Sequence, residues 1–278
     1  MLLATNDKHS KLSQKRHCAP RSSLVARDRE FAIIQEHIEM RKSLHVYGEE
    51  GTGKSALLDH SYDFLKDQGS LVPIYCRSSR TLRNILLQMA LFLLSHFSHL
   101  ESVDKFKCVK EIQCGSDIKK LSIRELRNIV YFYISLEDFC VILDHLEYVT
   151  PKINGFLTIL YEKATVITAS RQSWELSDYS FKGRLDYGLY LIPKLSIGNL
   201  KRKDALVLMK NLSLNLPLGL AVKRKMFDDV FRISRGNPKV ISTVFERARR
   251  PGYNKNNVLN LNLIMIDSRI KEMLSGWR

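Results

Sequence analysis

The feature of this sequence that most constrains its fold is a glycine-rich stretch at residues 48–55. It consists of Gly-Glu-Glu-Gly-Thr-Gly-Lys-Ser and fits the pattern G-x-x-x-x-G-K-S/T at each position. The apolar residues 43–48 predict a strand before it, and the amphipathic residues 55–69 predict a helix after it. Glycines let successive backbone N–H groups turn inward around an anion. The sequence therefore predicts a strand, a phosphate-binding loop and a helix, in that order.

The residues of this loop have distinct expected roles toward ATP. Lys54 is expected to reach the β- and γ-phosphates, and the Ser55 hydroxyl is expected to bind Mg²⁺. The helix that begins near Lys54 directs the positive end of its dipole at the same phosphates. The other residues of the predicted nucleotide-binding loop are Gly48, Glu49, Glu50, Gly51, Thr52, Gly53 and Ala56.

Two polar residues at the ends of further apolar runs are predicted to complete the site. Asp144 ends the run 139–144, which is apolar enough for a central strand, and it is expected to hold Mg²⁺ together with Ser55. Arg171 follows the run 165–170. An arginine at the end of such a strand can stabilise the charge of the γ-phosphate.

The group that activates water is less clearly marked. Many ATPases carry a second acid directly after the metal-binding aspartate, but here His145 follows. Glu147 is the nearest carboxylate and is the predicted catalytic substitute, while Glu49 and Glu50 remain further options. We therefore expect slow hydrolysis. His145 is interpreted as a turn residue, with water positioning or partner contact as alternatives.

Strands and helices alternate along most of the chain. Alternation of this kind implies parallel strands joined by helical crossovers, with both faces of the sheet covered by helices. After Pro193 three helical segments follow, and these predict a smaller lid. The fold class is thus α/β with a helical lid. The expected strands lie at 43–48, 71–76, 139–144, 165–170 and 188–193. The expected regions are a basic flexible arm at 1–23, a P-loop core at 24–194, the lid at 195–250 and an amphipathic tail at 251–278.

The charge balance favours a polyanionic partner. Lys and Arg total 44 against 29 Asp and Glu, which gives a formal net charge of +15 over 278 residues. A merely solvated basic surface is the alternative. Basic clusters at 201–203, 223–225 and 247–250 make DNA a candidate partner through the lid and the N-terminal arm. Any such binding is expected to be directed at the phosphate backbone, since no sequence-reading module is evident.

Cysteines and apolar runs indicate the compartment. The five cysteines are irregularly spaced without a C-x-x-C pair, so neither a zinc site nor a disulfide framework is predicted. The most apolar window, 85–94, is far shorter than the ~20 residues that span a bilayer. A cytoplasmic protein with no membrane partner is the expectation.

Taken in order, these motifs resemble the STAND branch of the AAA+ P-loop ATPases (an NB-ARC-like core with a helical lid). Residues 24–31 (LVARDREF) are similar to the opening motif of that family, with Ala26 where glycine is usual. The segments 143–149 and 168–172 resemble its hydrophobic-Asp and Thr-Ser-Arg motifs. Residues 235–241 (RGNPKVI) resemble its Gly-x-Pro motif, whose proline, Pro238 here, packs near the adenine.

The resemblance implies a nucleotide-dependent assembly switch that binds ATP or ADP with Mg²⁺ and recruits a partner. STAND proteins normally carry a large effector or repeat region, which is not evident here. The resemblance thus predicts self-association or a separate effector protein.

Two other functions stay open. The first is a DNA-bound AAA+ ATPase similar to origin-recognition or transposition-regulator ATPases. The second is a binding module in which the nucleotide only stabilises the fold. A metabolic kinase is disfavoured, because no substrate lid of that type is visible in the sequence.

Overall fold

A computed structural model describes residues 26–98, 115–174, 188–214, 216, 220–255, 258–264, 266–267 and 270. The predicted basic arm at 1–23 lies outside these residues, as does much of the predicted tail. Within the described residues no helix is long and apolar enough to cross a membrane.

The centre of the molecule is a five-stranded parallel sheet with the strand order β2-β3-β4-β1-β5. The strands are short, and all except the edge strand β5 are mostly buried, as expected for a sheet covered on both faces. The predicted α/β fold is thereby confirmed. The strands are β1 (Leu44–Tyr47), β2 (Val72–Cys76), β3 (Phe139–Leu143), β4 (Thr165–Ser170) and β5 (Lys194–Ser196).

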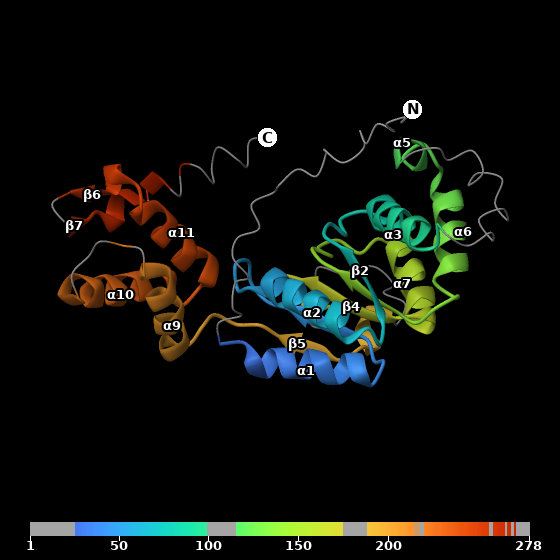
Figure 1. The fold of residues 1–278 in the computed structure, drawn as a ribbon, viewed down its shortest axis with the longest axis horizontal. Coiled ribbons are helices and arrows are strands. Elements are labelled where there is room, and N and C mark those ends of the chain that lie inside the picture. The colour runs from blue at the N-terminus through green and yellow to red at the C-terminus, as the bar shows by residue number, and fades with distance from the viewer. Residues whose placement is uncertain are drawn as a thin grey trace, which may run out of the picture.

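Helices cover both faces of the sheet (Figure 1). One face packs against α1 (Asp28–Glu39) and α2 (Lys54–Gln68). The other packs against α3 (Leu82–His96), α6 (Ile123–Tyr133) and α7 (Pro151–Lys163). Successive residues of a strand point to opposite faces, so Val141 joins the second core while Cys140 and Ile142 join the first. The short helices α5 (Gly115–Ile118) and α8 (Gly188–Leu191) complete this part.

Local signals explain several helix boundaries. Ser122 and Glu125 form a capping box at the start of α6, in which each side chain bonds the backbone N–H of the other residue. Thr150 caps α7 ahead of Pro151. A backbone N–H at the first position of a helix has no intrahelical acceptor, so proline loses no hydrogen bond there. Gly69 ends α2 in the left-handed conformation, with a φ of 65°. The hydroxyl of Thr81 likewise caps α3.

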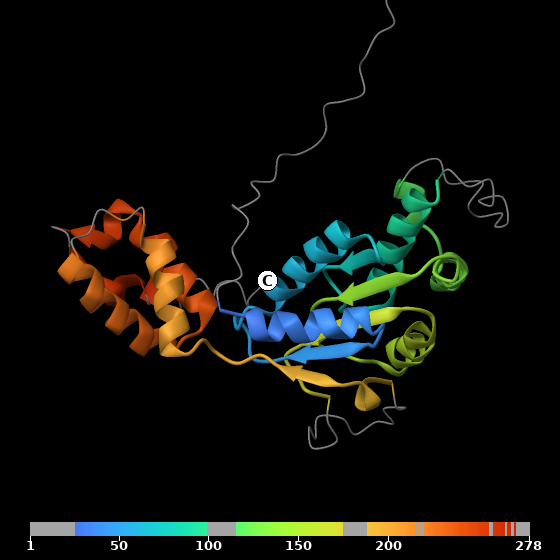
Figure 2. The ribbon, with the colours of Figure 1, turned by 60° about the horizontal axis from the view of Figure 1, so that its bottom comes forward.

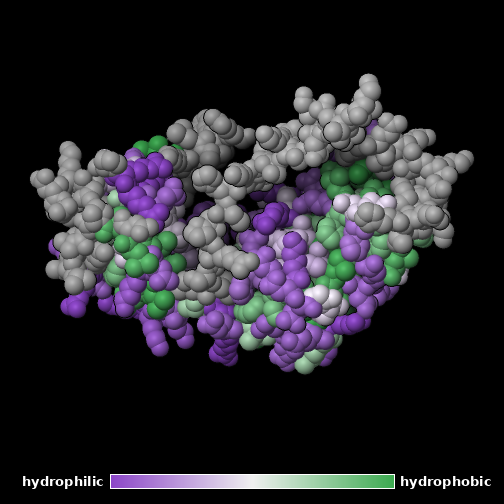
Figure 3. Space-filling view, in the orientation of Figure 1, coloured by the Kyte–Doolittle hydropathy of each residue, from purple (hydrophilic) through white to green (hydrophobic). Residues whose placement is uncertain are grey.

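The lid is built from helices with a core of their own. It comprises α9 (Arg202–Ser213), α10 (Leu220–Ser234) and α11 (Pro238–Ala248), followed by the 3-10 helix η2 (Pro251–Tyr253) and the hairpin β6 (Asn254–Lys255) and β7 (Val258–Leu259). Phe227, Ile241 and Phe245 are among its buried side chains. Figure 2 shows the lid beside the sheet, joined to it by the extended segment after β5. Figure 3 shows the molecule from the side seen in Figure 1. Hydrophilic residues gather over the middle of this side, and hydrophobic residues gather over α3 and α6.

The fifth strand differs from the prediction. The apolar residues 188–193 were expected to form it, but Gly188–Leu191 is a helical turn and β5 occupies Lys194–Ser196. A short apolar run fits either a strand or a buried helical turn, so it does not discriminate between them. Strand β5 has only three residues and lies at an edge of the sheet beside β1, so it leaves little periodic signal. The last strand of the sheet therefore ends at Ser196 instead of at residue 193.

Candidate nucleotide-binding site

The glycine-rich loop lies between β1 and α2, at the carboxyl edge of the parallel sheet. Gly51 has a φ of 82°, which side-chain-bearing residues rarely adopt. A Cβ added there would lie 2.6 Å from Asn237 Oδ1 and 2.7 Å from Lys239 Cβ. Gly51 is therefore required by contact with the lid as well as by its own backbone conformation. Gly53, also left-handed, precedes the first turn of α2, which contains Lys54 and Ser55.

The side chain of Lys54 folds back onto the backbone of this loop. Its Nζ donates hydrogen bonds to the carbonyl oxygens of Gly48 and Glu49, at 2.7 and 2.8 Å. Thr52 Oγ1 also donates to the Glu49 carbonyl oxygen, at 2.9 Å. Partial burial lowers the pKa of the Lys54 ammonium, while the nearby carboxylates of Glu147 and Asp144 oppose that shift. The ammonium thus lies in a partly dry environment between the loop and two acids.

Asp144 follows β3 directly, and its residue is only 3% exposed. Its Oδ1 accepts a hydrogen bond from the His145 backbone N–H at 2.8 Å, and the Tyr75 hydroxyl donates to Oδ2 at 3.3 Å. His145 has a φ of 57°, so the chain turns sharply after the aspartate. The His145 ring stays half-exposed, with Nε2 3.7 Å from Asp144 Oδ2. The carboxylate is therefore held in place by two neighbours.

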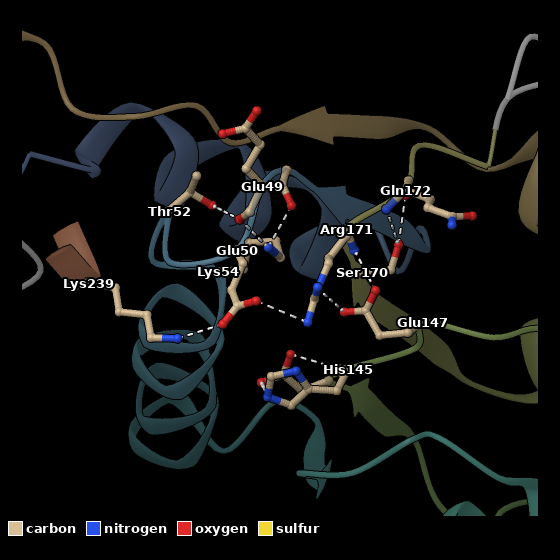
Figure 4. Close-up of polar contacts among 12 residues, drawn as sticks. Glu49, Glu50, Thr52, Lys54, His145, Glu147, Ser170, Arg171, Gln172 and Lys239 are labelled. Atoms are coloured by element: carbon tan, nitrogen blue, oxygen red, sulfur yellow. Dashed lines mark hydrogen bonds and ion pairs between the residues drawn. The ribbon is translucent and has the colours of Figure 1, made fainter. Parts of the chain in front are cut away.

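Glu147 turns back toward the site and contacts Arg171. Glu147 Oε2 accepts a hydrogen bond from the Arg171 backbone N–H at 3.2 Å, and Oε1 lies 3.7 Å from Arg171 Nε. The Leu146 N–H bonds the Ala169 carbonyl oxygen at 2.8 Å and fixes this approach. Figure 4 shows Glu147 and Arg171 facing each other beside His145. The sequence left the direction of Glu147 open, and the structure places it at the site.

The lid contacts the glycine-rich loop through the start of α11. Asn237 caps α11, and its Nδ2 donates to the Glu50 carbonyl oxygen at 2.9 Å. The Lys239 backbone N–H bonds the Gly51 carbonyl oxygen at 3.2 Å. Gly236 has a φ of 79°, and a Cβ there would lie 2.1 Å from the Leu200 carbonyl oxygen. The segment that joins core and lid is thereby packed tightly against the Gly-x-Pro motif.

Comparisons with known proteins find structural relatives only. No family model and no curated protein sequence match the chain. Solved structures do match. The Orc1 protein of Aeropyrum pernix in complex with DNA has a TM-score of 0.57 at 14% identity, over 89% of this chain and 65% of Orc1. A Walker-type ATPase of Pyrococcus abyssi scores 0.54 at 17% identity, over 91% and 74%. AMPPCP-bound DnaA from Aquifex aeolicus scores 0.51 at 19%, over 81% and 62%.

The chain has the AAA+-type P-loop fold. These structures support the broad AAA+ part of the resemblance, whereas none of the three supports the narrower STAND assignment. The chain spans slightly less than two thirds of the length of Orc1 and of DnaA.

At the junction of this AAA+-type core and lid lies a cavity of about 450 Å³, within the usual size range of ligand pockets. Most predicted site residues line it: Glu50, Gly51, Gly53, Lys54, Ser55, Ala56, Glu147, Arg171 and Pro238. Gly48, Glu49, Thr52 and Asp144 do not line it. Gly48 and Glu49 instead bond Lys54, and Asp144 lies next to His145, which does line the cavity.

The lining also contains residues that the sequence did not single out or did not place. Arg80 and Ser242 were missed, and Lys239 of the lid also lines the cavity. Arg80 follows β2 in a loop held by a bond from the Ser79 N–H to the Asp144 carbonyl oxygen, at 3.0 Å. A polar residue after each parallel strand was the available signal, because all strand ends meet at one edge.

The charges of the lining favour an anion. Among the residues that the structure describes, four cationic side chains line the cavity (Lys54, Arg80, Arg171 and Lys239) against two carboxylates (Glu50 and Glu147). This excess of positive charge suits a polyphosphate. Ser55 and Asp144, the predicted Mg²⁺ ligands, carry a hydroxyl and a carboxylate, which are the kind of hard oxygen donors that this ion prefers. Within the described part of the chain no three His, Cys, Asp or Glu side chains form a metal cage.

His45 holds the strand end that carries Arg171. The ring is buried in β1, with Nδ1 2.7 Å from Thr168 Oγ1 and Nε2 2.8 Å from the Gln172 carbonyl oxygen. Ser170 Oγ donates to the same carbonyl oxygen, at 2.7 Å. Burial is the main cause that lowers the pKa of His45 from 6.5 to about 4. A neutral imidazole thus connects the glycine-loop strand to the turn at residues 170–172.

Proposed function

We propose that this chain is an AAA+ ATPase that binds ATP with Mg²⁺, hydrolyses it slowly and acts on DNA. The observation that carries the proposal is the cavity itself. It brings the P-loop, the ends of neighbouring strands and the Gly-x-Pro motif of the lid into one cation-rich pocket. The similar fold of the Walker-type ATPase of Pyrococcus abyssi supports the same conclusion.

Each residue has a role that its position supports. Lys54 would bind the β- and γ-phosphates, and Arg171 would stabilise charge that develops on the terminal phosphoryl group. Mg²⁺, held by Ser55 and Asp144, would neutralise phosphate charge. Glu147 would orient the attacking water. Since Glu147 is engaged by Arg171 in the present arrangement, its carboxylate is only partly free for that role, and slow turnover follows.

The proposed DNA partner is supported by one structure of similar fold and by the lid surface. The Orc1 structure of the same fold was solved in complex with DNA. In this chain Lys201, Arg202, Lys203, Arg224 and Lys225 are exposed. One predicted contact is wrong: Arg247 is only 7% exposed, and its Nη1 donates to the Ile264 carbonyl oxygen at 2.9 Å. The side chain of Lys223 lies outside the described residues.

Binding to DNA is expected to fall steeply with salt. Lys and Arg contacts to phosphates release counterions, so retention of double-stranded DNA should drop at least about tenfold between ~50 and 200 mM salt. Fluorescence anisotropy with a labelled duplex of mixed sequence measures this. Lys201→Gln/Lys203→Gln should weaken binding and lower the log–log salt slope by about 1 to 2.

The matched control removes two exposed lysines of the core, Lys42→Gln/Lys152→Gln, and should leave the slope unchanged. An affinity that is the same at both salt concentrations would rule out backbone-directed DNA binding. An equal loss in both double variants would show that net charge, rather than the lid surface, governs the interaction.

A nucleotide-dependent assembly switch is the second candidate. It is favoured by the direct contact between the lid and the P-loop, in which Asn237 and Lys239 bond residues 50 and 51. A lid that touches the phosphate loop can respond to the nucleotide. In that function the chain would use ATP to recruit a partner protein or a second copy, and DNA would leave its turnover unchanged.

A further inference from the structure

Glu50 forms an ionic bridge across the cavity. Its Oε1 lies 2.5 Å from Lys239 Nζ of the lid, and its Oε2 lies 3.1 Å from Arg171 Nη2 at the end of β4. Figure 4 shows the Glu50 carboxylate between these two cations. One carboxylate of the P-loop thus connects the lid to the strand end that carries Arg171.

The bridge uses cations that a terminal phosphate would also need. Arg171, Lys239 and Glu50 all line the cavity that contains Lys54 and Ser55. A carboxylate and a phosphate oxygen are alternative acceptors for the same guanidinium and ammonium donors. Glu50 therefore holds two of the four lining cations in the arrangement that the structure shows.

We propose that Glu50 is a specificity-determining residue that competes with the γ-phosphate for Arg171 and Lys239, and so sets the preference between nucleoside triphosphate and diphosphate. This inference rests on the proposed nucleotide-binding function and changes the role expected for Glu50. A diphosphate leaves the bridge intact, and the lid stays attached to the P-loop through it. A triphosphate gains the two cations only by displacing the carboxylate.

The position of Glu50 is fixed independently of its charge. Its backbone carbonyl accepts from Asn237 Nδ2, and the following Gly51 carbonyl accepts from the Lys239 N–H. These bonds remain when the side chain is changed. The Lys239 ammonium is the main cause of a lowered Glu50 pKa, so the carboxylate is ionised at neutral pH. A neutral isostere at residue 50 should therefore remove the competition and leave the loop in place.

The test compares Glu50→Gln with the wild-type chain by isothermal titration calorimetry, using AMPPCP and ADP with Mg²⁺. Both pairs are more than half-exposed, and exposed pairs are weak, so the expected gain is modest. Glu50→Gln should bind AMPPCP about threefold to tenfold more tightly and ADP within about twofold of the wild type. The matched control is Glu246→Gln, which removes an exposed carboxylate from α11, the lid helix that carries Lys239.

The outcomes separate this inference from the proposed function. An AMPPCP-to-ADP affinity ratio that rises in Glu50→Gln alone supports the competition. A ratio that is unchanged, or that rises equally in Glu246→Gln, overturns it while nucleotide binding stands. No binding of either nucleotide by the wild type overturns the proposed function, and the inference with it. Since Glu50 is an exposed loop residue, overlapping melting curves are expected for all three proteins.

Discussion

Lys54→Ala is expected to reduce the ATP turnover rate by about 100- to 1000-fold. Removal of one preorganised donor from a phosphoryl-transfer site has an effect of this order, and Lys54 is the cation held inside the P-loop. A phosphate-release assay at saturating ATP measures the rate. The fold should survive, because the mutation removes a partly desolvated charge, and the two carbonyl groups that lose a donor belong to the partly exposed Gly48 and the exposed Glu49.

The control for this prediction is Lys66→Ala, in the last turn of the same helix and away from the cavity. It should keep the wild-type turnover rate. Turnover that persists in Lys54→Ala would show that the phosphates bind elsewhere, and the functional account would then lose its central residue.

Acid is expected to destabilise the chain through His45. The folded state lowers the pKa of this buried imidazole from 6.5 to about 4, so the folded state resists a proton that the unfolded chain accepts. Stability is therefore fully present above pH 6.5 and falls as the pH drops from 6.5 toward 4. A shift of this size corresponds to ~3 kcal/mol in the free energy of unfolding. Urea unfolding at several pH values in this window measures the loss.

His45→Gln separates this effect from other acid effects. The amide cannot titrate in this range, so the variant should lose most of the pH slope between 6.5 and 4, whatever its stability at neutral pH. Equal slopes in the wild type and His45→Gln would show that other groups cause the acid sensitivity.

The sequence predicts the local parts of the site well, because the residues of each motif are close together in the sequence. The P-loop needs only its own glycines, Lys54 and Ser55 together with a strand before and a helix after. Asp144 and Arg171 are recognisable because each ends an apolar run, and parallel strands end at one edge of the sheet.

Contacts between distant segments were beyond the sequence. Nothing near Glu50 indicates that its carboxylate meets Lys239, which follows 189 residues later. Arg80 likewise reaches the cavity only because strand order places β2 beside β3. The required glycines at 51 and 236 are recognisable as motif members. A Cβ does not fit there because of contacts with residues distant in the sequence, and these contacts depend on the tertiary structure.

The burial of Arg247 is predictable from the helical periodicity of α11. The buried positions of α11 include Ile241, Val244 and Ala248, at helical spacing, and Arg247 lies three residues after Val244 on the same side. The periodicity alone therefore argues against an exposed arginine at this position. Cluster counting along the sequence ignores this periodicity, and it overstated the basic surface of the lid.

The most direct test of the proposed function is the ATP hydrolysis rate with and without double-stranded DNA. A DNA-acting ATPase predicts a slow basal rate that rises severalfold as DNA saturates the protein, and no response in Lys54→Ala. A flat rate across the DNA titration, with nucleotide still bound tightly, would contradict the DNA-coupled function and favour the assembly switch.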